Sequence, residues 1–306
     1  MSNHFGDGSL VAVDIAALVD DLVAETAVLH AALDGLRPEQ WSLATPAARW
    51  SVGDHVSHLA YFDVTTLRSI LDPEQFRLDA AALRAGGDDF SDRIAAEYRS
   101  LPGEALLAWF QTARAALVDG YRAVDPGRRL PWYGLDMTPA SSVTARLMET
   151  WAHGHDIVDA LGTSLVATVR LRHVADLGIR AMPYSYAIND LPLPIDSIMV
   201  ELMAPGGSVW SWGSAHAVNR VEGNALDFCR VVTQRRHLDD TGLVVIGPVA
   251  QQWISVAQAF AGPAGPGRAR ARHAGTSAEV PGSLHDMCLA RSSANGDVRA
   301  RSKEDQ

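Results

Sequence analysis

The sequence predicts a fold of the α plus α+β class, in which a four-helix bundle is followed by a small α+β domain. The chain has 306 residues, which is enough for about two domains. Its first half contains four segments with apolar residues at helical spacing, and its second half contains an alternating stretch that is typical of a β-hairpin. We therefore expect the bundle over residues 13–165 and the α+β domain over residues 190–262.

Each bundle helix is marked by an apolar face or by a capping residue. The first is expected over residues 15–36, where apolar residues recur every three or four positions. The second begins near Val52, directly after a serine that can cap it. A polar, glycine-containing stretch separates it from the third helix, over residues 106–121, and the fourth begins at Pro139 and stops at Gly162.

The second half combines strand and helix patterns. Apolar residues alternate from Ile198 to Leu202, and a Gly-Gly turn follows, which predicts a hairpin. The segment "NALDFCRVVTQRRH" is expected to be helical, "LVVIG" to be a short buried strand, and Pro248 to open a further helix. Residues 1–12 are expected to be a flexible N-terminus. Residues 263–306 are rich in Gly, Pro, Ala, Ser and Arg without periodicity, which predicts a disordered and dispensable tail.

Composition narrows the classes of partner. The formal net charge of −10 argues against nucleic acid and against an anionic membrane, so a small-molecule substrate is expected, and nothing indicates the oligomeric state. Cys229 and Cys288 lie far apart, which predicts neither a disulfide framework nor a thiolate zinc site. The sequence shows no signal-peptide pattern and no run of about 18 apolar residues. We therefore expect a cytoplasmic protein.

A concentrated polar motif, "METWAHGHD", lies in the fourth helix. Glu149 and His153 are four residues apart and share one face, with Asp156 next along it, so the first two can close on one divalent metal. The second helix offers His55 and His58 as a third ligand. Three protein ligands leave one coordination position open, which is the catalytic arrangement. The alternative is structural: such a Glu and His pair is common on solvated helix surfaces, and a lone core histidine is often only a packed residue.

The strings "WSVGDHVSHLAYFD" and "RLMETWAHGHDIVDALG" resemble the metal-binding signature of the DinB-like, mycothiol-dependent maleylpyruvate isomerase superfamily. This resemblance implies His58, Glu149 and His153 as ligands of a divalent ion, with zinc as the expected metal, and mycothiol as the thiol. The C-terminal part is similar to an actinobacterial branch of uncharacterised metal-binding proteins with a sterol-carrier-like domain. The resemblance covers about residues 13–268 and is more specific for fold and metal than for substrate.

Three further residues are candidates for catalytic roles. His55 shares a face with His58 and can hydrogen-bond a substrate or line its pocket. Asp156 lies one turn beyond His153 and can orient it. The resemblance implies that Arg235 holds an anionic substrate, and because that substrate must lie within reach of the ion, we expect Arg235 to face the metal across a cleft between the domains. The structural alternative is that it complements the dipole at the C-terminus of its helix.

These observations predict a metal-dependent enzyme, either an isomerase or a thiol transferase. The ion would activate a thiol or a substrate oxygen for isomerisation, S-transfer or addition to a small substrate, which the arginine suggests is anionic. Because the C-terminal motif departs from that of the isomerases, a metal-dependent hydrolase, lyase or cyclase of secondary metabolism stays open. So does a non-catalytic binding protein with a structural metal.

Overall fold

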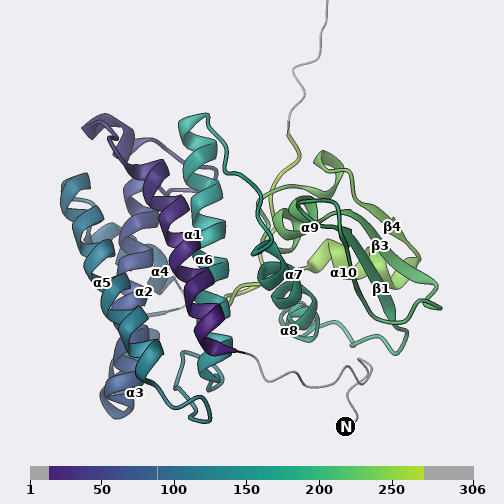
Figure 1. Ribbon diagram of the computed structural model, residues 1–306, viewed down its shortest axis with the longest axis horizontal. Helices are drawn as coiled ribbons and strands as arrows, with labels where there is room; N and C mark the ends of the chain where they lie inside the picture. The colour runs from purple at the N-terminus through teal and green to yellow at the C-terminus, as the bar shows by residue number, and fades with distance from the viewer. Residues whose placement is uncertain (1–13, 88, 272–306) are drawn as a thin grey trace, which may run out of the picture. The chain divides into compact units, whose positions relative to one another are not determined.

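The computed structural model describes residues 14–87 and 89–271 (Figure 1). The predicted N-terminal segment 1–12 and residues 272–306 of the predicted tail lie outside the described residues. A helical first part is followed by a four-stranded sheet with helices packed against it, which confirms the predicted fold class. Within the described ranges, no helix is long and apolar enough to cross a membrane.

Four long helices form the bundle and run side by side in Figure 1. They are α1 (Ile15–Leu33), α2 (Val52–Leu71), α5 (Gly103–Ala123) and α6 (Pro139–Leu161). Their ends follow from local chemistry. The Ser51 side chain accepts a hydrogen bond from the Asp54 N–H, and the Asp54 carboxylate accepts one from the Ser51 N–H, so α2 begins with a capping box. Pro139 opens α6, and Gly162 ends it in the left-handed conformation, with φ of 68°.

Two helices replace the polar stretch that was expected between the second and third bundle helices. These are α3 (Pro73–Ala85) and α4 (Phe90–Glu97). The Asp72 side chain caps α3 by accepting a hydrogen bond from the Gln75 N–H, at 3.1 Å. Each helix buries few residues, Phe76 and Ala80 on α3 and Ile94 and Ala95 on α4, so the apolar periodicity is too weak to reveal them.

The linker between the two predicted domains is also helical. It contains α7 (Leu171–Arg180) and α8 (Met182–Ile188). Helix α7 packs against both α6 and α9 (Ala225–Val232). The α7–α9 contact is close, because a Cβ placed on Gly178 would lie 2.6 Å from a methyl carbon of Val232. The linker therefore joins the bundle to the second domain through packed side chains.

The sheet has the strand order β2-β1-β3-β4. Its strands are β1 (Ile198–Met203), β2 (Val209–Trp212), β3 (Asn219–Asn224) and β4 (Val244–Ile246). The predicted hairpin is confirmed, since β1 and β2 pair antiparallel with Met203 opposite Val209. Strand β3, which pairs parallel to β1, was not predicted because "NRVEGN" holds one large apolar residue. The predicted burial of "LVVIG" is wrong: β4 is an edge strand, and Val244 and Ile246 are 53% and 44% exposed.

One hydrophobic cluster runs from the bundle into the second domain. It includes Leu117 of α5, Trp151 of α6, Val174 of α7, Phe228 of α9 and Trp253 of α10 (Pro248–Val256), and Pro248 opens α10 as predicted. A second cluster, around Leu59 and Phe110, fills the other end of the bundle. The shared core fixes α6 against the chain segment that follows α9, and this segment carries Arg235.

Candidate metal centre

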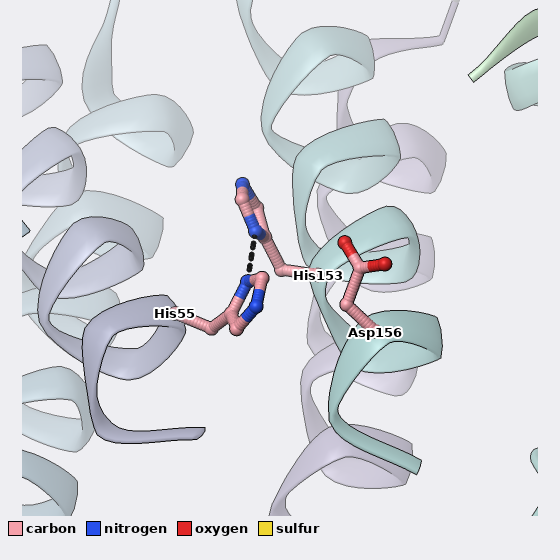
Figure 2. A group of neighbouring side chains, drawn as sticks. All are labelled: His55, His153 and Asp156. Carbon is pink, nitrogen blue, oxygen red and sulfur yellow. Dashed lines mark hydrogen bonds between the residues drawn. The ribbon is translucent and has the colours of Figure 1, made fainter. Parts of the chain in front are cut away.

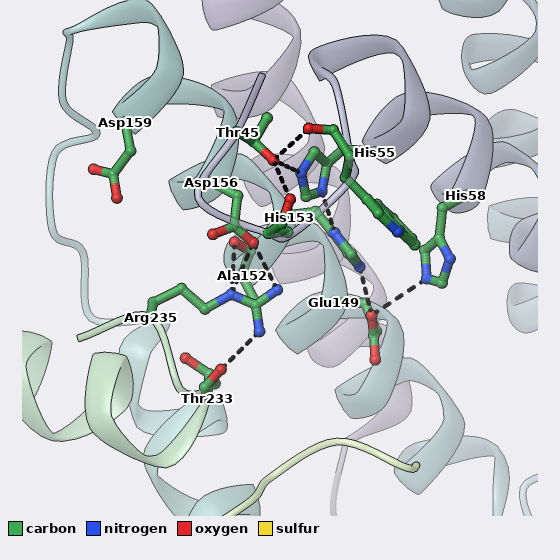
Figure 3. A network of polar contacts seen from close by, with 12 residues as sticks. Thr45, His55, His58, Glu149, Ala152, His153, Asp156, Asp159, Thr233 and Arg235 are labelled. Carbon is green, nitrogen blue, oxygen red and sulfur yellow. Dashed lines mark hydrogen bonds and ion pairs between the residues drawn. The ribbon is translucent and has the colours of Figure 1, made fainter. Parts of the chain in front are cut away.

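The three predicted metal ligands lie together between α2 and α6. His58, Glu149 and His153 each offer one ligand atom, and these atoms all lie within 4.8 Å of one another. Oε2 of Glu149 is 3.0 Å from Nε2 of His153 and 3.7 Å from Nε2 of His58 (Figure 3). Helical register explains the arrangement, because Glu149 and His153 are one turn apart on α6. His58 faces them from α2.

The surroundings favour the protonation states that metal ligands need. Burial, followed by the charge of His153, lowers the pKa of His58 to about 4, so its imidazole is neutral at neutral pH. Burial alone would raise the pKa of Glu149, but hydrogen bonds with His153 and His58 hold that pKa well below its ordinary value. A neutral imidazole and an ionised carboxylate are the forms that bind a divalent cation.

His55 holds the second ring nitrogen of His153. The two Nδ1 atoms are 2.6 Å apart, and Nε2 of His55 is 2.8 Å from Oγ1 of Thr45 (Figure 2, Figure 3). The Thr45 hydroxyl donates to the carbonyl of Trp50, so it accepts from Nε2–H of His55. Nδ1 of His55 then accepts from Nδ1–H of His153, whose other ring nitrogen, Nε2, is 3.0 Å from Oε2 of Glu149.

In the structure His55, rather than Asp156, contacts the second ring nitrogen of His153. His55 was expected to meet a substrate, but it is fully buried and both its nitrogens are engaged within the protein. Asp156 was expected to orient His153, and His55 makes that contact instead. An imidazole that ligates a metal usually needs such a partner on its other nitrogen. Nδ1 of His58, by contrast, is buried and has no hydrogen-bond partner among the described residues.

His55, His153 and Asp156 form a second group of possible ligands (Figure 2). Two ligands of a tetrahedral zinc ion with bonds of about 2.0–2.1 Å are separated by about 3.4 Å. The 2.6 Å between the two Nδ1 atoms is well below that separation and is the length of a hydrogen bond. The 3.0 and 3.7 Å spacings around Glu149 lie on either side of it. The group of His58, Glu149 and His153 therefore fits a metal better.

Asp156 pairs with two arginines from the C-terminal part of the chain. Oδ2 is 3.0 Å from Nη2 of Arg235, and Oδ1 is 2.6 Å from Nη2 of Arg268. Arg235 also donates to the carbonyl groups of Ala152 and Thr233 (Figure 3). It thus points toward α6 rather than to solvent. It was expected at the end of a helix, but α9 ends at Val232 and Arg235 follows it in a turn.

Arg268 is a site residue that sequence reasoning missed. It was assigned to the disordered tail, but the structure places residues 263–271, and Arg268 is an ion-pair partner of the buried Asp156. Local composition gave no signal of this contact, because the segment lacks an apolar pattern. Two guanidinium groups against one carboxylate leave one positive charge in excess beside α6.

Trp50 was also missed. Its indole stacks on the His153 ring, with centroids 5.7 Å apart and planes at 9°, and it also contacts His55 and His58. Its Nε1–H donates to Asp92 of α4 at 2.7 Å. Trp50 also lines a cavity of about 430 Å³, so it borders both the histidine cluster and that cavity. Its position depends on the loop before α2, which carries no periodic pattern.

Comparisons with known proteins agree with this architecture. The family model described as Mycothiol maleylpyruvate isomerase N-terminal domain matches residues 22–158. Two uncharacterised proteins of Mycobacterium tuberculosis, from strains CDC 1551 / Oshkosh and H37Rv, are each 42% identical over 255 residues, which is 83% of this chain and 99% of theirs.

Similarity to solved structures extends beyond the bundle. The crystal structures of mycothiol-dependent maleylpyruvate isomerase and of a single-site mutant each match with a TM-score of 0.53 and 13% sequence identity. The match covers 78% of this chain and 95% of the other. At this identity it shows a shared fold. Because it covers much more of the chain than the bundle does, that fold includes part of the second domain.

Proposed function

The chain belongs to the DinB-like, mycothiol-dependent maleylpyruvate isomerase superfamily, and we propose that it is a metal-dependent enzyme that uses a small thiol. The observation that supports this most strongly is the convergence of His58, Glu149 and His153, whose ligand atoms all lie within 4.8 Å of one another. Zinc is the proposed metal. A bound divalent ion would supply a Lewis acid that lowers the pKa of a thiol or polarises a substrate oxygen.

The residues of the chain itself would orient the ligands and the reactants. Nε2 of His58, the Glu149 carboxylate and Nε2 of His153 would hold the ion, and three protein donors leave room for a reactant. His55 fixes the ring of His153, and the Trp50 indole covers that ring. The proposed reaction classes are isomerisation, S-transfer and addition. The proposed substrate is a small, anionic molecule, and a cytoplasmic location stays a prediction.

Thiol binding tests this function directly. Calorimetric titration of mycothiol into the zinc-loaded protein is expected to show binding with proton release, because a thiol that ionises on binding loses its proton. Proton release is measured as a dependence of the heat on the ionisation enthalpy of the buffer. The zinc-free protein and a mycothiol analogue with oxygen in place of sulfur are the controls. Equal binding in either control would refute the thiol-dependent function.

Arg235 is proposed to hold an anionic substrate. Its partner Asp156 is shared with Arg268, so the trio retains one positive charge that a substrate carboxylate can balance. The Arg235→Ala variant is expected to bind a small dicarboxylate probe more weakly by about 1.5–3 kcal/mol, the range for hydrogen bonds to charged groups, with its zinc content unchanged. Arg236→Ala is the matched control, because Arg236 pairs with Asp159 instead. Equal losses in the two variants would exclude a specific role for Arg235.

A further inference from the structure

The segment of residues 262–268 runs from the second domain back to α6. At its start, the Tyr184 hydroxyl of α8 donates to the carbonyl of Gly262 at 2.7 Å and accepts from its N–H at 2.9 Å. At its end, Nη2 of Arg268 lies 2.6 Å from Oδ1 of Asp156 on α6. The segment is therefore anchored at both ends, by a hydrogen-bonded pair at one and by an ion pair at the other.

The middle of the segment has few contacts. Residues 263–267 are exposed and have the sequence "PAGPG". The side chain of Gln258 donates to the carbonyl of Pro263 at 3.4 Å, but residues 264–267 make no hydrogen bond or ion pair with another described residue. Exposed segments with few contacts are those that open locally without unfolding of the whole domain.

The backbone of the segment has a glycine in an unusual conformation near each end. Gly262 has a φ of 147° and Gly267 a φ of 67°, values that glycine adopts far more readily than other residues. Residues of this kind can act as hinges, because they absorb large changes of φ and ψ. Pro263 and Pro266 lie between them and restrict the backbone, so the segment can move as one semi-rigid unit.

Both ends of the segment adjoin the ion pair between Arg235 and Asp156. The Arg235 guanidinium lies over the ring of Phe260, 5.9 Å from its centroid, just before the segment begins. Arg268, at the other end, contacts the same Asp156 carboxylate that accepts from Arg235. The Arg235 side chain is 13% exposed and that of Asp156 is 1% exposed. A reactant therefore has little access to Arg235 unless the segment moves.

The contact of Arg268 with Asp156 can be released without leaving a buried charge unpaired. Oδ2 of Asp156 also lies 3.0 Å from Nη2 of Arg235, and that pair does not involve the segment. Breaking a buried ion pair is strongly destabilising when one charge is left uncompensated, but here the carboxylate keeps one guanidinium partner. Arg268 itself would move into water, where its charge is solvated.

We propose that residues 262–268 form a lid over Arg235 that is held closed by the ion pair between Arg268 and Asp156. Opening admits a reactant to Arg235. Closure excludes water from Arg235 and Asp156, which strengthens their electrostatic interactions with a bound molecule. The role of the lid in catalysis rests on the proposed function, whereas its opening is a property of the free protein and is measured there.

Exchange of the Arg235 Nε–H proton with water tests the lid. This proton is donated to Asp156 and Ala152, at 3.1 and 3.3 Å, and NMR of protein with isotope-labelled arginine detects it. In the metal-free wild-type protein its exchange should change little with urea below the unfolding transition, because a short exposed segment uncovers little surface when it opens. The Arg114 Nε–H is the internal control. It is bonded to the buried Asp63 at 2.7 Å, so its exchange requires unfolding of the bundle and should accelerate with urea.

Substitutions in the lid should change the exchange at Arg235 and not at Arg114. Arg268→Ala is expected to raise it about tenfold or more, because a hydrogen bond between charged groups is lost. Gly267→Ala removes no contact, but alanine disfavours the left-handed φ of the closed lid, so a rise of about fivefold or more is expected. Gly265→Ala is the matched control. Gly265 has no positive φ, and a Cβ there would meet no atom within 4 Å, so exchange should stay unchanged.

The proposal is overturned if urea accelerates exchange at Arg235 and Arg114 in parallel in the wild-type protein, since the segment would then open only when the protein unfolds. It is also overturned if Arg268→Ala leaves exchange at Arg235 unchanged, or if Gly267→Ala and Gly265→Ala have equal effects. All measurements use the full-length protein without metal, thiol or substrate. A protein that bound neither zinc nor a thiol would refute the proposed function and leave the lid standing.

Discussion

The Asp63→Asn variant is expected to have a free energy of unfolding about 3–5 kcal/mol below that of the wild-type protein, the range for breaking a buried ion pair. Asp63 is completely buried and accepts two hydrogen bonds from Arg114, at 2.7 and 3.2 Å, with Arg146 3.3 Å away. Asparagine keeps the shape but removes the charge, so two buried guanidinium groups lose their counter-ion. Urea denaturation followed by circular dichroism measures the loss.

Asp79→Asn is the matched control for this substitution. Asp79 pairs with Arg68, but both side chains are more than 40% exposed, so the expected loss is less than about 1 kcal/mol. The double variant Asp63→Asn/Arg146→Met should recover part of the stability lost in Asp63→Asn, because one of the two uncompensated charges is gone. Similar losses of unfolding free energy in Asp63→Asn and Asp79→Asn would contradict the conclusion that Asp63 is the buried counter-ion of Arg114 and Arg146.

Replacing His58, Glu149 or His153 by alanine is expected to reduce zinc affinity more than the loss of a residue that only orients a ligand. Loss of such an orienting residue costs about 10–100-fold in metal affinity. Each substitution removes one of the three donor atoms that lie within 4.8 Å of one another. His55→Gln should lose affinity within the 10–100-fold range, since His55 contacts His153 and not the proposed ion. Competition with a chromophoric chelator measures all four variants.

His155→Gln controls for the loss of a buried histidine on α6. His155 is only two residues from His153, but its ring packs edge-on against Trp151, with centroids 4.3 Å apart. Its nitrogens are not among the grouped ligand atoms of the described residues. This variant should bind zinc like the wild-type protein. Wild-type affinity in the Glu149→Ala variant would remove Glu149 from the proposed ligand set.

The parts of the fold that the sequence predicted well are those with local signals. The starts of α2 and α6 follow from Ser51 and Pro139, and the end of α6 follows from Gly162. Helices α3 and α4 escaped prediction because each buries few residues. Burial of β4 was overestimated because an apolar run does not reveal whether a strand lies at the edge of a sheet.

For the candidate site too, the contacts that follow from local sequence signals could be predicted, and those that depend on tertiary packing could not. Helical periodicity places Arg146, Glu149 and His153 on one face of α6. That Nε and Nη2 of Arg146 have no hydrogen-bond partner among the described residues is visible only in the structure. The contact of His55 with His153 depends on the register between α2 and α6. The positions of Trp50 and Arg268 depend on segments without periodicity. Tertiary packing, rather than local pattern, decides these contacts.

The central claim is that His58, Glu149 and His153 hold one divalent ion. Its most direct test is a crystal structure of the zinc-loaded protein with anomalous diffraction data collected on both sides of the zinc absorption edge. We predict one anomalous peak per chain, about 2.0–2.2 Å from Nε2 of His58, from Nε2 of His153 and from a carboxylate oxygen of Glu149. Absence of a peak there, or a peak among His55, His153 and Asp156 instead, would contradict the account.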